Sequence, residues 1–252
     1  MKLDWTYLGT VAYQKAMQLQ YEYAKNVVRG AEPRLFVLQH PPTVTLGRHS
    51  DLSNLCLEPK DMAQKGIRVF QVLRGGDVTF HGPGQLVGYT VARLDHAGCT
   101  VPKWVQGHAE AIVRFLKRYG IESRWSEKYP GVWVGREKIA ALGFHILRRV
   151  STHGVAINLN PDLSYFRTIV PCGLRNHGVT SMVRLRGKVP EMSNAAGELA
   201  EEITKIFGWV RGEVLDAGEI LSSSSIGASV FEYGETNSRA CSLSKFGSHR
   251  QL

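Results

Sequence analysis

The sequence predicts an α/β domain of the α+β kind, built on a mixed sheet with hairpins. Helix-like and strand-like segments are mixed along the chain without the strict alternation of a doubly wound fold. Two short apolar segments, 131–134 and 138–142, flank a tight polar turn, which is typical of a β-hairpin. The 252 residues are 43% apolar and 21% charged, which is ordinary for a globular protein.

The first expected element is an amphipathic helix over residues 11–29, because apolar residues recur there three to four positions apart. Thr10 is expected to cap this helix and Gly30 to end it. The later elements are expected as strands at 35–38, 69–73 and 86–92, a helix at 102–119, the hairpin at 131–142, a strand at 154–159, and a helix at 193–207 that ends at Gly208.

The chain changes character near residue 222, where a run of four serines begins. Scattered Gly, Ser and Asn follow, with little apolar periodicity. We therefore expect one catalytic domain over residues 1–221 and a flexible tail over residues 222–252.

Several classes of protein are disfavoured by the composition. No apolar run approaches the roughly 18 to 20 residues of a membrane span. The N-terminus lacks the features of a signal or transit peptide, so a cytoplasmic protein is expected, although a processed organelle protein stays possible. The protein is also expected to be a monomer. The four cysteines form no CxxC pair, which argues against a zinc site and a disulfide framework. No metal and no cofactor are expected.

The formal net charge of +9 suits an acidic partner or simply a basic solvated surface. Nucleic acid is not expected, because the chain has no run of Lys and Arg interleaved with aromatic residues and no helix-turn-helix or zinc-finger pattern.

The densest motif is residues 74–85, where four glycines and a proline fall within twelve positions. Glycine lets the backbone approach a ligand closely, and this segment also carries polar donors. It has neither the P-loop nor the dinucleotide-binding spacing. The alternative is a purely structural connection between two strands.

Three further residues could carry chemistry. Cys172 lies between Pro171 and Gly173 and could be a nucleophile, although a lone cysteine also serves as a small buried apolar residue. Lys138 begins an apolar hairpin strand and could be desolvated there or solvated at an edge. His153 could bind a ligand or have a structural role.

Together these segments resemble the lipoyl(octanoyl) transferase family, the octanoyltransferases of protein lipoylation. Four motifs of that family occur here in family order. They are RGG-x-x-T-x-HGPGQ at 74–85, K-I-A-x-x-G at 138–143, HG-x-A-x-N at 153–158, and VPCG with VTS at 170–173 and 179–181.

The resemblance implies a mixed, largely antiparallel sheet flanked by helices, related to the catalytic domain of biotin and lipoate protein ligases. It implies octanoyl (or lipoyl) transfer through a thioester on Cys172. Lys138 would face that thiol, lower its pKa and act as acid and base. The implied acyl site comprises Arg74, Gly75, Gly76, Asp77, Val78, Thr79, Phe80, His81, Ala141, Leu142, Gly143, Gly154, Val155 and Ala156.

The implied donor is octanoyl-acyl carrier protein. The implied acceptors are the lipoyl domains of 2-oxoacid dehydrogenase E2 subunits and the glycine cleavage H protein. These partners are acidic, so the positive charge could steer them to one site. Two rivals stay open: an ATP-dependent lipoate or biotin ligase, which needs no nucleophilic cysteine, and a non-catalytic module that binds acyl carrier or lipoyl domains.

Overall fold

A nine-stranded mixed sheet forms the centre of the computed structural model, which describes residues 1–170 and 177–222. Its strand order is β12-β1-β2-β6-β10-β9-β8-β7, with β11 beside β9. Along the stretch β2-β6-β10-β9-β8-β7 each strand is antiparallel to its neighbour. Strand β1 is parallel to both β2 and β12, and β11 is parallel to β9. The bounds are β1 Lys2–Thr10, β2 Arg34–Gln39, β6 Gln85–Val91, β7 Arg124–Ser126, β8 Gly131–Val134, β9 Glu137–Leu147, β10 Val150–Asn158, β11 Gly178–Val179 and β12 Val210–Val214.

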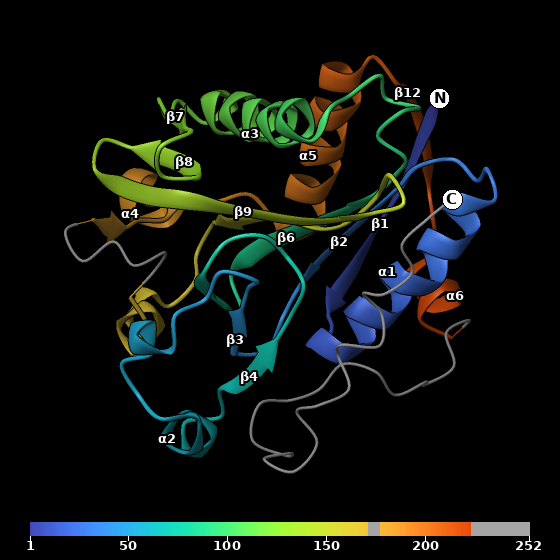
Figure 1. Cartoon of the computed structure of the whole chain (residues 1–252). Coiled ribbons are helices and arrows are strands. Elements are labelled where there is room, and N and C mark those ends of the chain that lie inside the picture. The colour runs from blue at the N-terminus through green and yellow to red at the C-terminus, as the bar shows by residue number, and fades with distance from the viewer. Residues whose placement is uncertain (171–176, 223–252) are drawn as a thin grey trace, which may run out of the picture.

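A second, three-stranded sheet has the order β4-β3-β5 (Figure 1). It consists of β3 (Thr43–Leu46), β4 (Arg68–Gln71) and β5 (Val78–His81). It has its own apolar core, which includes Val44, Leu46 and Phe80.

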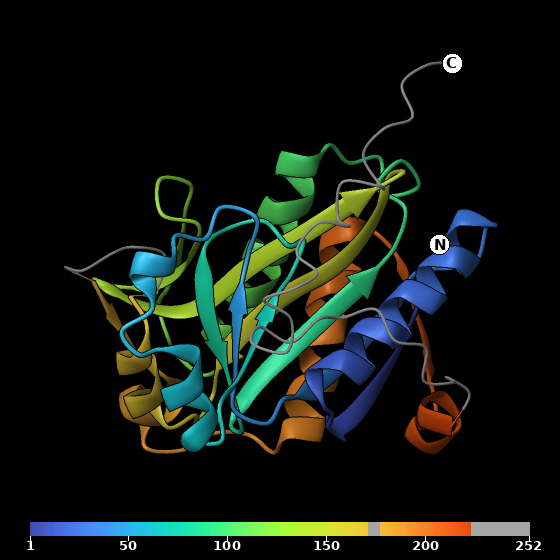
Figure 2. The ribbon, with the colours of Figure 1, turned by 60° about the horizontal axis from the view of Figure 1, so that its bottom comes forward.

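Helices cover both faces of the large sheet (Figures 1 and 2). Helices α3 and α5 pack on one face, while α1, α6 and the small sheet lie on the other. The helices are α1 Tyr13–Val28, α2 Pro59–Gln64, α3 Val101–Arg118, α4 Met182–Arg186, α5 Met192–Phe207 and α6 Ala217–Ser222, with 3₁₀ turns at Leu52–Asn54 and Leu163–Thr168.

Strand β2 is an example of why the central strands are apolar along their whole length. Successive side chains of a strand point to opposite faces of the sheet. Leu35 and Val37 join the core beneath α3 and α5, whereas Phe36 and Leu38 join the core beneath α1. A strand that is covered on both faces needs a continuous apolar run, and β2 has one.

The fold class predicted from the sequence is confirmed: the sheet is mixed, largely antiparallel and flanked by helices. The helix expected at 193–207 is also confirmed as α5, and Gly208 ends it in the left-handed conformation. The expected cap of the first helix is wrong. Thr10 is the last residue of β1, and the N-cap is Ala12, which makes no side-chain capping bond.

The elements that were not predicted from the sequence are strands β1, β3, β5, β7, β11 and β12 and helices α2, α4 and α6. The boundary near residue 221 stays a prediction, and residues 223–252 lie outside the described residues.

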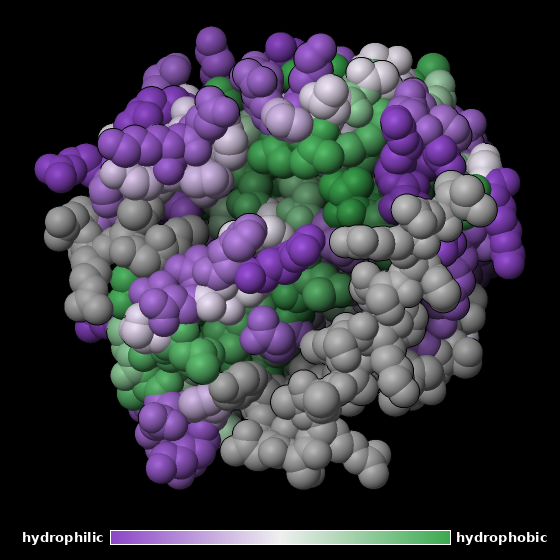
Figure 3. Space-filling view, in the orientation of Figure 1, coloured by the Kyte–Doolittle hydropathy of each residue, from purple (hydrophilic) through white to green (hydrophobic). Residues whose placement is uncertain are grey.

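On the face drawn in Figure 3, apolar surface gathers near the centre, and a band of polar side chains crosses it.

Candidate active site

A cavity of about 230 Å³ lies between the small sheet and strands β9 and β10 of the large sheet. Tyr13, His49, Tyr89, Pro130 and His153 form part of its wall. The rest of the wall comes from the three segments that the family motifs indicated. The residues concerned are Arg74, Gly76, Asp77, Val78, Thr79, His81, Ala141, Leu142, Gly143, Gly154, Val155 and Ala156.

Two residues predicted for the acyl site do not line this cavity. Phe80 points into the core of the small sheet, where its ring stacks on Tyr165 at 4.9 Å between centroids. Gly75 holds the loop to β9, because its N–H donates to the carbonyl oxygen of Phe144 at 2.8 Å.

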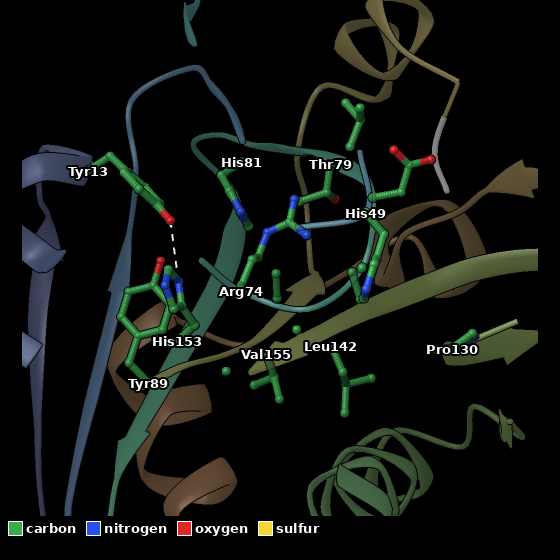
Figure 4. Close-up of a pocket in the computed structure, with 17 residues that line it drawn as sticks. Tyr13, His49, Arg74, Thr79, His81, Tyr89, Pro130, Leu142, His153 and Val155 are labelled. Atoms are coloured by element: carbon green, nitrogen blue, oxygen red, sulfur yellow. Dashed lines mark hydrogen bonds between the residues drawn. The ribbon is translucent and has the colours of Figure 1, made fainter. Parts of the chain in front are cut away.

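The floor of the cavity is nearly free of side chains. Ala156 pairs with Ala141, and Gly154 pairs with Gly143, across strands β10 and β9. Side chains two positions apart share a face of the sheet. A Cβ at Gly143 would lie 2.9 Å from the carbonyl oxygen of Gly75 and 3.1 Å from Cδ of Arg74, so this glycine lets the loop of Arg74 pack closely on the floor. Figure 4 shows Leu142 and Val155 pointing away from the cavity, toward the helix below. The resulting floor is mostly backbone and methyl groups, which suits an apolar chain.

Arg74 anchors the wall opposite this floor. Its guanidinium donates to the hydroxyl and carbonyl oxygens of Thr45 and to the carbonyl oxygen of Gly75. The carboxylate of Asp77 accepts a hydrogen bond from the Asn54 amide at 2.6 Å. These bonds fix the loop and hold the Arg74 guanidinium against Thr45 in the wall of the cavity.

Buried tyrosines and histidines close one end of the cavity (Figure 4). The ring nitrogens of His40 contact the carbonyl oxygen of Val11 at 2.7 Å and the hydroxyl of Tyr89 at 2.8 Å. Burial lowers the pKa of His40 to about 4. Burial, followed by the charges of His40 and Arg74, lowers the pKa of His81 to about 3, although a bond to Gln85 opposes this. These imidazoles are therefore neutral at physiological pH.

His153 has the most constrained position at this end. Its φ is +58°, a left-handed conformation that few side chains other than Asn, Asp and His adopt readily. Its backbone N–H donates to Oε1 of buried Gln20 at 2.6 Å. Its Nδ1 lies 3.4 Å from the Tyr13 hydroxyl, but its buried Nε2 has no hydrogen-bond partner among residues 1–170 and 177–222. Burial and the nearby Arg74 charge hold the pKa of His153 well below its usual value.

Lys138 lies beside the other end of the cavity. A hollow of about 20 Å³ contacts Lys138 and shares Thr79, Ala141 and Ala156 with the larger cavity. The Lys138 side chain is buried, and its Nζ donates to the carbonyl oxygen of Pro130 at 3.1 Å. The same ammonium lies 5.0 Å from the centroid of the Trp133 ring.

A chain of hydrogen bonds holds the backbone of Lys138 in place. The backbone N–H of Thr180 donates to the carbonyl oxygen of Lys138 at 3.0 Å. Asn158 donates to the carbonyl oxygen of Thr180, and Gln85 donates to Asn158, both at 3.0 Å. Residues from four motifs therefore meet around one lysine.

Cys172, the predicted nucleophile, lies outside the described residues, as does Cys241. The chain resumes at His177, whose ring lies 5.3 Å from that of Trp133. Cys56 is exposed and Cys99 is half-buried, and neither lines the cavity. Burial raises the pKa of the Cys99 thiol, which makes it a poorer nucleophile.

Some wall residues had no clear signal in the sequence. Tyr13 lies in the first turn of α1, and His49 and Pro130 lie in loops outside the motifs. Their position depends on the way in which the two sheets pack. Within the described ranges, no three His, Cys, Asp or Glu residues gather to hold a metal ion. Nor is any described helix long and apolar enough to cross a membrane.

Comparisons with known proteins identify the family of this chain. The model of the lipoyl protein ligase A/B catalytic domain matches residues 12–204. An octanoyltransferase of Caldicellulosiruptor saccharolyticus is 42% identical over 211 residues, covering 82% of this chain and 90% of the relative. One from Alkaliphilus metalliredigens is 38% identical and covers 83% and 97%.

Solved structures show the same fold. Lipoate-protein ligase A bound with ATP aligns with a TM-score of 0.72 and 16% identity, covering 88% of this chain and 95% of that one. A bi-partite lipoate protein ligase from Thermoplasma acidophilum aligns with a TM-score of 0.66 and 16% identity, covering 88% and 93%. The sequence matches, which span most of both chains, decide the family: this chain belongs to the lipoyl protein ligase A/B catalytic-domain family, alongside its octanoyltransferases.

Proposed function

We propose that this protein is an acyltransferase that moves an octanoyl group from the thioester of an acyl carrier protein to a lysine amine of a lipoyl domain. Its close relatives are octanoyltransferases over most of their length. The observation that carries the proposal is the cavity of about 230 Å³ that adjoins the buried amine of Lys138.

The volume of the cavity fits a chain of about eight carbons. An apolar cavity of about 150 Å³ holds benzene, with six carbons, so by proportion this one holds about nine. Burial of an octanoyl tail on the backbone and methyl floor would stabilise the complex by about 5 to 6 kcal/mol, at about 0.8 kcal/mol per methylene. That is enough to favour C8 over shorter chains.

In the first step, the Cys172 thiolate attacks the donor thioester, and the carrier thiol leaves with a proton. An ammonium within about 4 to 6 Å favours the thiolate, and Lys138 is the cation that we assign to this role. One thioester replaces another, so the step needs no ATP.

In the second step, the lysine amine of the acceptor attacks the acyl-enzyme. The Cys172–acyl bond breaks, an amide forms, and the amine proton passes to Lys138 as it alternates between charged and neutral forms. The step runs downhill because an amide is more stable than a thioester.

The chain length allows Cys172 to reach Lys138. Cys172 and His177 are five positions apart in the sequence, and five positions span at most about 18 Å. His177 packs on Trp133, the same ring over which the Lys138 ammonium lies. This anchor therefore supports the pairing of the two residues.

Trapping the acyl-enzyme tests the function. The protein is incubated with octanoyl-acyl carrier protein without ATP or magnesium, and its intact mass is measured. We expect one octanoyl group on Cys172, none on a Cys172→Ser variant, and normal labelling of the control Cys56→Ser. A strict need for ATP would favour a ligase instead, and full biological activity of Cys172→Ser would favour a binding module.

Steering of acidic partners is expected to depend on salt. Arg48 and Lys128 are exposed and lie next to or near His49 and Pro130 of the cavity wall in the sequence. They are therefore placed to contact a carrier protein that docks over the cavity. We expect the KM for octanoyl-acyl carrier protein to rise with ionic strength and to rise severalfold in Arg48→Gln/Lys128→Gln. Lys25→Gln, about 18 Å along α1 from Tyr13, is the control. If the KM changed neither with salt concentration nor with these substitutions, electrostatic steering of the carrier protein would be excluded.

A further inference from the structure

We propose that His153, together with the Tyr13 hydroxyl, ends the acyl cavity with a hydrogen-bonding group, so that the site selects acyl chains by the chemistry of their far end. This inference rests on the octanoyl transfer proposed above. It makes His153 a specificity-determining residue. Acyl chains of nine atoms should be accepted when the ninth atom is a hydroxyl oxygen and disfavoured when it is a methyl carbon.

The geometry places His153 at the far end from the reaction. Lys138 adjoins the cavity beside Ala156, whereas His153 lies three residues along the same strand, about 10 Å away at about 3.3 Å per residue. Figure 4 shows Tyr13, Tyr89 and His153 gathered at the end opposite Pro130, whose carbonyl oxygen binds Lys138.

The length of an octanoyl chain matches this distance. An extended chain advances about 1.2 Å per bond, since three backbone bonds span about 3.6 Å, so the seven carbon–carbon bonds of octanoyl reach about 8 Å. With the acyl carbonyl placed beside Ala156 and Lys138, the terminal methyl of octanoyl would stop short of His153, and a ninth chain atom would reach it.

The ring offers that ninth atom a polar surface. Nε2 of His153 is buried and has no partner among the described residues, whereas Nδ1 faces the Tyr13 hydroxyl. A hydroxyl in this position would form a hydrogen bond to Nε2. Nε2 is already closed to solvent, so a methyl at this place would leave it without a partner, which is costly. His153 is also held rigidly by the bond from its N–H to Gln20, so it cannot turn away cheaply.

Two isosteric donors test this. Nonanoyl and 8-hydroxyoctanoyl thioesters of acyl carrier protein both carry nine chain atoms and differ only in the last one. We expect wild-type kcat/KM to favour the hydroxyl chain by about tenfold or more, as for a satisfied against an unsatisfied buried polar group. His153→Leu is expected to abolish or invert this preference, measured as the ratio of kcat/KM for the two nine-atom donors.

Two further variants separate specificity from folding. Tyr13→Phe removes one oxygen without touching the left-handed backbone and is expected to weaken the preference. His108→Leu is the control: His108 is equally buried, but it contacts Trp104 and Thr90 in the core beneath α3, so the preference should persist.

Each outcome has a clear meaning. Equal use of the two nine-atom donors by the wild type, or an unchanged preference in His153→Leu or in Tyr13→Phe, would overturn the inference. A proportional fall for all three donors in His153→Leu would show a structural role and would overturn it as well. Absence of octanoyl transfer by the wild type would instead refute the proposed function.

Discussion

Replacing Lys138 with methionine is expected to lower kcat/KM for octanoyl transfer by about 10²- to 10⁴-fold, the range that a general acid–base group contributes. Methionine has a similar length but no charge and no proton to exchange. Both proposed steps then lose their proton carrier, and the Cys172 thiolate loses its neighbouring cation. We therefore expect slow acylation as well as slow transfer to the acceptor.

The free energy of unfolding of the Lys138→Met variant should rise or stay unchanged. Lys138 is buried and lies over the Trp133 ring, so methionine fits the same apolar surroundings. Removal of the buried charge is favourable and offsets the hydrogen bond that the carbonyl oxygen of Pro130 loses. Urea unfolding and single-turnover acylation measure the two effects separately, with Lys103→Met on exposed α3 as the control. Retention of more than a tenth of wild-type acylation would remove Lys138 from the mechanism.

The predictable part of the fold is the part in which local chemistry and tertiary packing agree. Helix α5 has an apolar face and ends at a glycine, and both features survive in the structure. In contrast, Thr10 has the chemistry of a cap but belongs to β1, because pairing with β2 extends that strand to its last residue. Sheet pairing overrode a local preference.

One hairpin illustrates what sequence patterns miss. Strands β9 and β10 are longer than expected because a two-residue turn joins Leu147 to Val150. Arg148 and Arg149 both have positive φ, at 49° and 65°, as in a type I′ turn. Such turns usually carry Asn or Gly, so two arginines give no signal of one. The turn forms here because the long pairing of β9 with β10 outweighs the local cost.

The site divides in the same way. The small residues of the floor, such as Gly143 and Gly154, lie in motifs that the family resemblance identified. Tyr13 lies 61 positions before Arg74, and packing of α1 against the small sheet brings it to the cavity. No periodicity or spacing in the sequence encodes that contact. His81 and His153 of the polar end lie in the motifs, whereas Tyr13 required the structure.

Gly131→Ala is expected to lower kcat/KM by about 10²-fold, because a misplacement of about 1 Å at a reacting group has an effect of that size. A Cβ at Gly131 would lie 2.9 Å from Cε of Lys138 and 3.0 Å from the carbonyl oxygen of Ala140. The carbonyl belongs to the sheet and cannot move, so the lysine side chain must. Gly131 also has a φ of +156°, where an alanine is strained.

Gly135→Ala in the same hairpin separates displacement of the lysine from backbone strain. Gly135 has a φ of +58°, and nothing lies within 4 Å of its added Cβ. We expect about 1 to 2 kcal/mol of destabilisation from the left-handed backbone and near-normal kcat/KM. Melting curves and octanoyl transfer are measured for both variants. If the activities of the two fall together in proportion to stability, Gly131 serves the hairpin; if Gly131→Ala alone loses turnover while folded, this glycine exists to leave space for the Lys138 side chain.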